Sequence, residues 1–157
     1  MLSKTQQIIA YLVKKHHKPS VTVLIKLAYL VDLLSLKKYN TPITNYQYIR
    51  YYFGPYDKSI NGDIQTLVED QIIIPSIDYN QSGEEYVYYS YNSEFAGDLD
   101  QVTEQDKNVI DAFLEQVKGY GARTLTDIAY QTKPMKKIGA VLGQTQHLNE
   151  LLDMRAQ

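Results

Sequence analysis

The chain contains no cysteine and no tryptophan, and only three of its 157 residues are phenylalanine. The absence of cysteine excludes disulfide bonds, thiolate metal ligands and cysteine nucleophiles. No apolar run approaches the roughly 18 residues of a membrane-spanning helix, because Lys26 and Asp32 interrupt the most apolar segment. Residues 1–7 also lack the apolar core of a signal peptide. These absences predict a soluble, cytoplasmic protein without membrane contact.

A charge excess of either sign is also missing. Sixteen Lys and Arg residues face 18 Asp and Glu residues, which leaves a net charge of −2 and a pI of about 5.9. Nucleic-acid-binding domains usually show a basic stripe or a pI above ~9, so a nucleic-acid partner is disfavoured. What the chain has in excess is tyrosine, with 15 residues. This excess indicates either an AT-rich coding bias or an aromatic binding surface, since tyrosine supplies contact area at low entropic cost.

Motifs of catalysis are absent as well. The chain has no Gly-x-Ser-x-Gly elbow, phosphate loop, dinucleotide fingerprint or zinc-protease helix. The adjacent His16 and His17 lack the i, i+4 spacing that places two ligands on one helix face, and His147 is distant in the sequence. The sequence therefore predicts a protein that is not an enzyme and that holds no cofactor and no metal.

The most apolar segment, residues 20–39, is predicted to be a long central helix. Apolar residues recur at the i, i+3, i+4 and i+7 spacing of one helix face, in a stripe formed by Leu24, Leu27, Ala28, Val31 and Leu34. Apolar residues on other faces predict burial on several sides, with the remaining elements packed around this helix. Ser20 suits its N-cap, and Lys37 and Lys38 suit the negative end of its dipole.

Residues 45–53 have the tyrosine-rich and β-branched character of a strand, whose side chains alternate between two faces. The slightly more apolar face is expected to point into the core and consists of Gln47, Ile49, Tyr51 and Phe53. The opposite face is either covered too or exposes residue types of binding hot spots, and consists of Tyr46, Tyr48, Arg50 and Tyr52. Gly54-Pro55 is predicted to turn the chain into a helix over residues 57–70, which Asp57 caps.

Residues 71–77 and 84–91 are predicted to form a β-hairpin with its turn near residues 80–83. Together with the strand at 45–53, this hairpin would complete a three-stranded antiparallel sheet. The expected fold is therefore α+β and mainly helical, with helices around the central helix and a partly winged-helix-like arrangement.

One domain is expected over residues 1–157. Its first part, residues 1–92, would contain an N-terminal helix over 3–16, the central helix and the small sheet. An acidic connector over 93–102 follows, and residues 103–157 would form C-terminal helices. In this last part we expect a helix capped by Thr103, a short helix starting at Thr124, and one or two more helices after Met135.

Several of these segments resemble one known family. The central helix contains Ile25-Lys26-Leu27-Ala28-Tyr29-Leu30-Val31-Asp32, and a later turn reads Phe53-Gly54-Pro55-Tyr56-Asp57. Lys38-Tyr39 and Pro42-Ile43-Thr44 lie between these segments. This pattern resembles the Panacea domain, the SocA-like antitoxin domain of bacterial and phage toxin–antitoxin pairs. A further family segment, Leu-Ser-x-x-Thr-His-x-x-x-Pro-Trp, corresponds to Leu125 through Met135, where Ala129-Tyr130 replaces Thr-His and Met135 replaces Trp.

The resemblance implies a binding protein that neutralises a cognate toxin, encoded next to it, by direct contact. Some family members instead deliver their toxin to a protease. The alternative from the fold pattern is a winged-helix-like DNA-binding regulator, although the predicted helix over 57–70 has a net charge of −3. The expected protein-binding residues are Tyr46, Tyr48, Arg50, Tyr52, Gly54, Pro55 and Tyr56.

Three residues of the central helix could support that surface. From spacing alone, Lys26 and Asp32 would lie on a narrow solvent-facing strip. The resemblance implies instead that Lys26, Tyr29 and Asp32 contact the following strand or a partner.

Overall fold

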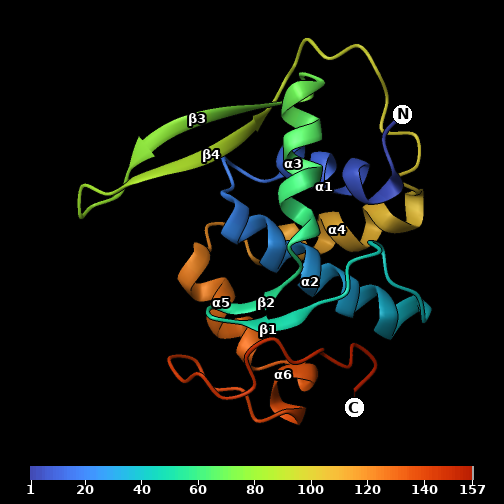
Figure 1. Cartoon of the computed structure of the whole chain (residues 1–157). Helices are drawn as coiled ribbons and strands as arrows, with labels where there is room; N and C mark the ends of the chain where they lie inside the picture. The colour runs from blue at the N-terminus through green and yellow to red at the C-terminus, as the bar shows by residue number, and fades with distance from the viewer. Residues whose placement is uncertain (157) are drawn as a thin grey trace.

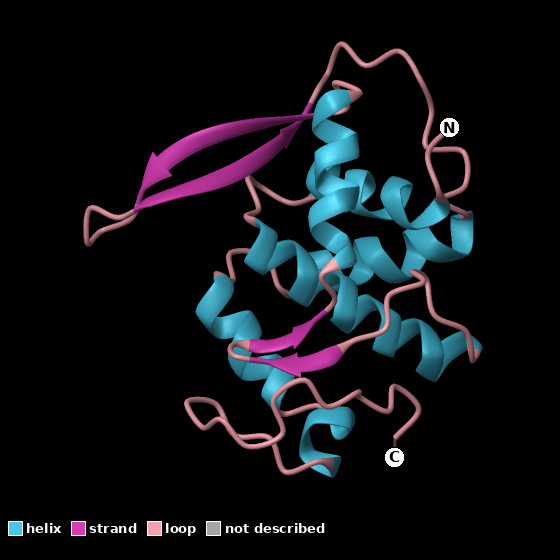
Figure 2. Ribbon diagram, in the orientation of Figure 1, coloured by secondary structure: helices cyan, strands magenta, loops and turns pink. Residues whose placement is uncertain are grey.

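The computed structural model describes residues 1–156, and within this range the chain forms six helices and two separate antiparallel two-stranded sheets (Figures 1 and 2). The helices are α1 (Lys4–Lys15), α2 (Val21–Tyr39), α3 (Ser59–Glu69), α4 (Glu104–Gln116), α5 (Ala122–Tyr130) and α6 (Lys133–Lys137). The strands are β1 (Ile49–Tyr51), β2 (Gly54–Tyr56), β3 (Ile73–Tyr79) and β4 (Glu85–Tyr91). The predicted α+β class, mainly helical, is confirmed.

Helix α2 is the central element, as predicted. It packs against α1, α3, α4, α5 and β2 (Figure 1), and every residue from Val23 to Asp32 is buried. The Ser20 hydroxyl accepts a hydrogen bond from the Val23 N–H at 3.3 Å and caps the first turn. Asn40 ends the helix in the left-handed region with φ of 60°, a conformation that asparagine tolerates better than most residues.

The helices α1 and α4 also begin where the sequence predicts. Ser3 and Thr103 each accept a hydrogen bond from the backbone N–H three residues later. Gln6 and Asp106 return the bond to the cap residue, so both helix starts are complete capping boxes. Each capping box joins residues only three positions apart, so it can be predicted from the sequence alone.

The predictions for the C-terminal segment are partly wrong. Helix α5 begins at Ala122 rather than Thr124, and within the described residues no helix follows α6. Gly139 and Gly143 adopt positive φ angles of 74° and 88°, which break a helical path. Residues 138–156 therefore form no further helix, and their one β-bridge joins Leu151 to Ile49.

The predicted three-stranded sheet is also wrong. β1 pairs with β2, and its other edge is taken by the C-terminal segment rather than by the hairpin. The Arg50 N–H donates to the Glu150 carbonyl at 2.9 Å, and the Leu152 N–H donates to the Tyr48 carbonyl at 2.9 Å. Gly54 begins β2 with φ of 120° instead of opening a helix. The chain turns one step earlier, at residues 52–53.

The β3–β4 hairpin is confirmed, and it projects from the helical body (Figures 1 and 2). Its base is held by buried Ile73 and Tyr89, and the Tyr89 N–H donates to the Pro19 carbonyl at 3.0 Å. Beyond the base, the apolar side chains that stay exposed are Ile74, Ile77, Tyr79, Tyr86 and Val87. This hairpin forms a second sheet, and the partial likeness to a winged helix stays a prediction.

The N-cap position of α3 is occupied by Lys58 rather than by the predicted Asp57. The Asp57 Oδ1 nevertheless accepts a hydrogen bond from the Ser59 N–H at 2.9 Å, just before the first turn. Asn61 and Gly62 lie inside this helix without ending it. None of the helices in residues 1–156 combines the length and the apolar character needed to cross a bilayer.

Candidate functional site

A buried carboxylate on α2 organises the segment that leads into β1. Asp32 is 1% exposed, and its Oδ1 accepts hydrogen bonds from the backbone N–H groups of Ile43 at 2.7 Å and Thr44 at 2.8 Å. Its Oδ2 accepts from the Thr44 hydroxyl at 2.5 Å and from the Tyr48 hydroxyl at 2.7 Å. Four donors thus converge on one side chain. The solvent-facing strip is therefore the wrong alternative, and contact of Asp32 with the following segment is confirmed.

Burial and hydrogen bonding act in opposite directions on this carboxyl group. Burial raises the pKa of Asp32, whereas the bonds from Thr44, Tyr48 and Ile43 lower it. Burial also raises the pKa of Tyr48 well above its ordinary value, and the neighbouring Asp32 charge adds to that shift. The Tyr48 hydroxyl consequently stays protonated and remains a donor to the carboxylate.

Two more residues of the expected binding face are buried with polar partners. The Tyr46 hydroxyl donates to Asp63 on α3 at 2.6 Å. The Arg50 guanidinium is 0% exposed and donates to the carbonyls of Tyr51, Val141 and Gln144 at 2.7, 3.0 and 2.7 Å. These bonds join the segment before β1 to α3, and β1 itself to the C-terminal segment.

The predicted orientation of residues 45–53 is therefore wrong. Tyr46, Tyr48 and Arg50 point into the molecule, whereas Tyr51 and Phe53, expected in the core, are 39% and 69% exposed. The prediction compared the apolar character of the two faces, but tyrosine and arginine are amphipathic and can be buried when their polar ends find partners. Those partners lie on other elements, so the sequence pattern of the strand does not reveal them.

Four aromatic side chains gather at the β1–β2 turn and form what we call the aromatic turn: Tyr51, Tyr52, Phe53 and Tyr56. The Tyr51 ring stacks on Tyr56 with centroids 4.9 Å apart and meets Tyr52 edge-on at 5.1 Å. Tyr52 is 53% exposed. The Tyr56 hydroxyl accepts a hydrogen bond from Asn61 at 2.6 Å, which ties the cluster to α3. Of these four residues, the sequence prediction included Tyr52 and Tyr56 and missed Tyr51 and Phe53.

Lys26 and Tyr29 lie beneath the aromatic turn, on α2. Lys26 is 2% exposed, has no salt bridge within residues 1–156, and burial lowers its pKa to about 8. The Tyr29 ring packs edge-on against Tyr48 at 5.2 Å, and its hydroxyl lies 2.7 Å from the Thr132 hydroxyl. α2 therefore connects the β1 segment to the region between α5 and α6.

The three segments that carry the family resemblance thus meet in space. A Cβ atom added at Gly54 would lie 3.6 Å from the Tyr130 ring and 3.9 Å from the Lys26 side chain. The Arg50 guanidinium lies over the Tyr130 ring at 5.6 Å. The turn, the helix and the 125–135 segment therefore lie close together in space.

A comparison with family models matches residues 24–134 to the antitoxin SocA-like Panacea domain, well over half of the chain. The chain belongs to this Panacea-domain family. The resemblance predicted from the sequence is confirmed. No curated protein and no solved structure matches the chain in the corresponding comparisons. The family is one of antitoxins, and membership implies a cognate toxin as partner.

This Panacea domain departs from the family pattern at two buried positions. Tyr130, in place of the family histidine, is 7% exposed, and its hydroxyl has no hydrogen-bond partner within the described residues. Met135, in place of the family tryptophan, is 0% exposed. Tyr130 lies next to Gly54 and Arg50, and Met135 lies in the hydrophobic core.

Residues 1–156 contain no group of three or more His, Asp or Glu side chains arranged to hold a metal ion. The contacts of Asp32 and Arg50 are those of a structural network, with partners inside the chain. The part of the site that faces solvent is aromatic.

Proposed function

We propose that this Panacea domain neutralises its cognate toxin by direct, stoichiometric contact, and that the aromatic turn is the main anchor. The observation that carries this proposal is the exposure of Tyr52 and Phe53 at 53% and 69% on a turn that is otherwise firmly held. Large aromatic side chains in the centre of an interface dominate binding energy in many complexes. Family membership supports a toxin as the partner.

The support beneath the turn makes it a suitable anchor. Arg50 binds three backbone carbonyls, and Gly54 packs on Tyr130, so both strands that flank the turn are fixed to the core. A rigid aromatic surface loses little conformational entropy on binding. Of the residues predicted from the sequence, Tyr52 and Tyr56 would contact the toxin. Tyr46, Tyr48, Arg50, Gly54 and Pro55, with Lys26, Tyr29 and Asp32, would hold the turn.

The β3–β4 hairpin is proposed as an accessory contact. It is a two-stranded sheet, so both of its strands are edges, and Ile77, Tyr79 and Val87 leave its distal half apolar and exposed. An exposed edge of this kind binds partners by strand addition. Delivery of a bound toxin to a protease would use the same toxin contact together with a further surface.

Co-expression with the adjacent reading frame tests this proposal. A neighbour that stops growth alone, is tolerated together with this chain, and co-purifies with it would support neutralisation by contact. A neighbour that is harmless and forms no complex would contradict it. Rescue of growth without a complex would exclude direct contact as the mechanism.

The DNA-binding alternative finds little support in the charge of α3. This helix contains Asp63 and Glu69 and no Lys or Arg, whereas a helix in a DNA groove faces phosphate charge. In an electrophoretic mobility assay at low salt, we expect the protein not to retard duplex DNA from the promoter region of its own gene. Retardation of the DNA that weakens steeply as the salt concentration rises would instead support a DNA-binding regulator.

A further inference from the structure

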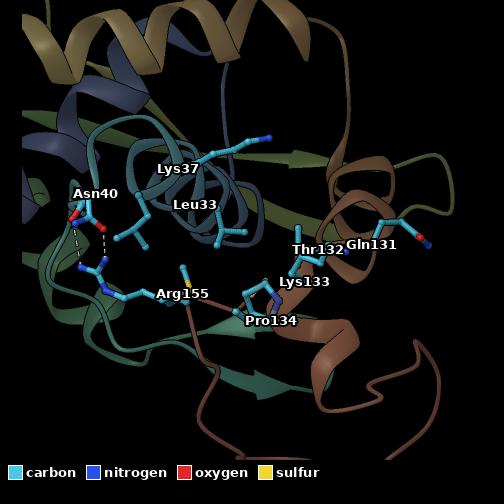
Figure 3. A pocket seen from close by; sticks show the side chains of 11 residues that line it. Leu33, Lys37, Asn40, Gln131, Thr132, Lys133, Pro134 and Arg155 are labelled. Carbon is cyan, nitrogen blue, oxygen red and sulfur yellow. Dashed lines mark hydrogen bonds between the residues drawn. The ribbon is translucent and has the colours of Figure 1, made fainter.

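A groove of about 840 Å³ lies on a different part of the molecule, between the end of α2, the α5–α6 junction and the C-terminal segment (Figure 3). Its apolar lining includes Leu33 of α2, Pro134 of α6 and Met154 of the C-terminal segment. Lys37 of α2, Lys133 of α6 and Arg155 of the C-terminal segment also line it (Figure 3). The groove combines an apolar interior with three cations.

Among the described residues, no carboxylate lines this groove to neutralise its positive charge. No salt bridge within residues 1–156 involves Lys37, Lys133 or Arg155. The C-terminal end of α2 contributes about half a negative charge, which three cations exceed. In a chain with a net charge of −2, this is a local concentration of positive charge without an ion-pair partner in residues 1–156.

The C-terminal wall of the groove is held in place. Arg155 donates to the Asn40 side-chain oxygen at 2.6 Å and to the Asn40 carbonyl at 3.3 Å (Figure 3). Asp153 pairs with Lys137 at 2.7 Å, and Leu152 is 4% exposed. Because the partners of Arg155 are neutral, its position is fixed while its charge stays available to a ligand.

We propose that this groove binds an acidic segment of a partner protein that also carries apolar side chains. The three cations would pair with Asp or Glu carboxylates, and Leu33, Pro134 and Met154 would receive the apolar side chains. A nucleic acid backbone would satisfy the cations but leave the apolar lining uncovered. The inference goes beyond the proposed function, since the groove and the aromatic turn share no residue and any protein could supply the segment.

Selection from a random short-peptide library displayed on phage tests the groove without any toxin. We expect the enriched peptides to combine Asp or Glu with Leu, Ile, Met or Phe, and to bind less tightly as salt is raised. Chemical-shift changes on addition of a synthetic enriched peptide should fall on Leu33, Lys133 and Met154. Enrichment of neutral or basic peptides, enrichment of none, or shifts elsewhere would overturn the proposal.

Charge variants supply the quantitative control. Lys37→Glu with Lys133→Glu should weaken binding of the enriched peptide about tenfold, because two exposed ion pairs become repulsive. Lys37→Gln with Lys133→Gln should weaken peptide binding less. This neutral pair still tests the groove if the charge-reversed variant fails to fold. Lys118→Glu with Arg123→Glu makes the same change in net charge away from the groove and should leave the affinity unchanged. Equal weakening by both Glu pairs would contradict a local site.

The result is independent of neutralisation. If the adjacent reading frame proves not to encode a toxin, peptide selection still tests whether the groove binds an acidic segment. If peptides fail to bind, the aromatic turn and the co-expression test are untouched.

Discussion

Two groups of tyrosines in one short stretch of chain have opposite environments. Tyr46 and Tyr48 are 8% and 1% exposed and donate hydrogen bonds to Asp63 and Asp32. Tyr51 and Tyr52, only a few residues later, are 39% and 53% exposed. Their hydroxyls have no hydrogen bond within the part of the chain that the structure describes.

Within this stretch, each buried tyrosine has a carboxylate partner on another element, whereas the exposed tyrosines have none among the described residues. Burial of the ring stabilises the fold, but burial of the hydroxyl without a partner costs about 1–3 kcal/mol. Asp63 removes that cost for Tyr46, and Asp32 removes it for Tyr48. We therefore assign stability to the buried group and binding to the aromatic turn.

The largest expected effect on stability comes from Asp32→Ala. This change leaves two backbone N–H groups and two hydroxyls without their acceptor in a buried site, so we expect the free energy of unfolding to fall by about 3 kcal/mol. Urea denaturation followed by circular dichroism measures it. Asp127→Ala, at an exposed position of α5, should change stability by less than about 0.5 kcal/mol. Equal midpoints for the two variants would refute the structural role of Asp32.

Lys26→Met should act in the opposite direction. Burial lowers the pKa of Lys26 from 10.5 to about 8, so the unfolded chain binds more protons between these values and stability rises with pH there. The buried charge thus destabilises the fold fully below about pH 8. We expect the variant to be more stable by about 2 kcal/mol at pH 7.

The pH dependence of the Lys26→Met effect provides its own control. The advantage of the variant should shrink as pH rises from 8 toward 10.5, because the native lysine becomes neutral. Ionisation of the buried tyrosines affects both proteins alike and cancels in the difference. An advantage that stays constant over this range would mean that packing, and not charge, causes it.

A smaller effect is expected for Tyr48→Phe. The change removes one of the four donors to Asp32 and keeps the ring, so stability should fall by about 1.5 kcal/mol. Growth rescue in co-expression should persist. If the Tyr48→Phe protein is folded but no longer rescues growth, Tyr48 takes part in the interface. The assignment of stability to the buried tyrosines and of binding to the aromatic turn would then be wrong.

Much of the helical fold could be predicted because its signals are local. The apolar periodicity of α2 and the caps Ser3, Ser20 and Thr103 lie within a few residues of the structures that they specify. The β3–β4 hairpin joins segments that are adjacent in the chain. The family resemblance likewise rested on short contiguous motifs.

The environment of the candidate site depends on contacts between distant residues and was less predictable. Residues 149–152, about a hundred positions later in the chain, form hydrogen bonds with the free edge of β1. No local sequence pattern predicts this pairing. The Asp32 network similarly joins α2 to Thr44 and Tyr48. Without these partners, the choice between the two faces of the 45–53 segment rested on apolarity alone and was wrong.

The smallest expected effect on stability comes from Tyr52→Ala combined with Phe53→Ala. Both side chains are exposed, so the free energy of unfolding should change by no more than about 0.5 kcal/mol. The matched control, Leu34→Ala with Tyr120→Ala, removes two other exposed apolar side chains far from the turn in sequence.

The measurement that tests the central claim most directly is growth rescue by this Tyr52/Phe53 variant, with its stability measured in parallel. Our account predicts that the variant folds normally and no longer neutralises or co-purifies the toxin, whereas the control variant does both. Full rescue by the folded Tyr52/Phe53 variant would contradict the assignment of binding to the aromatic turn.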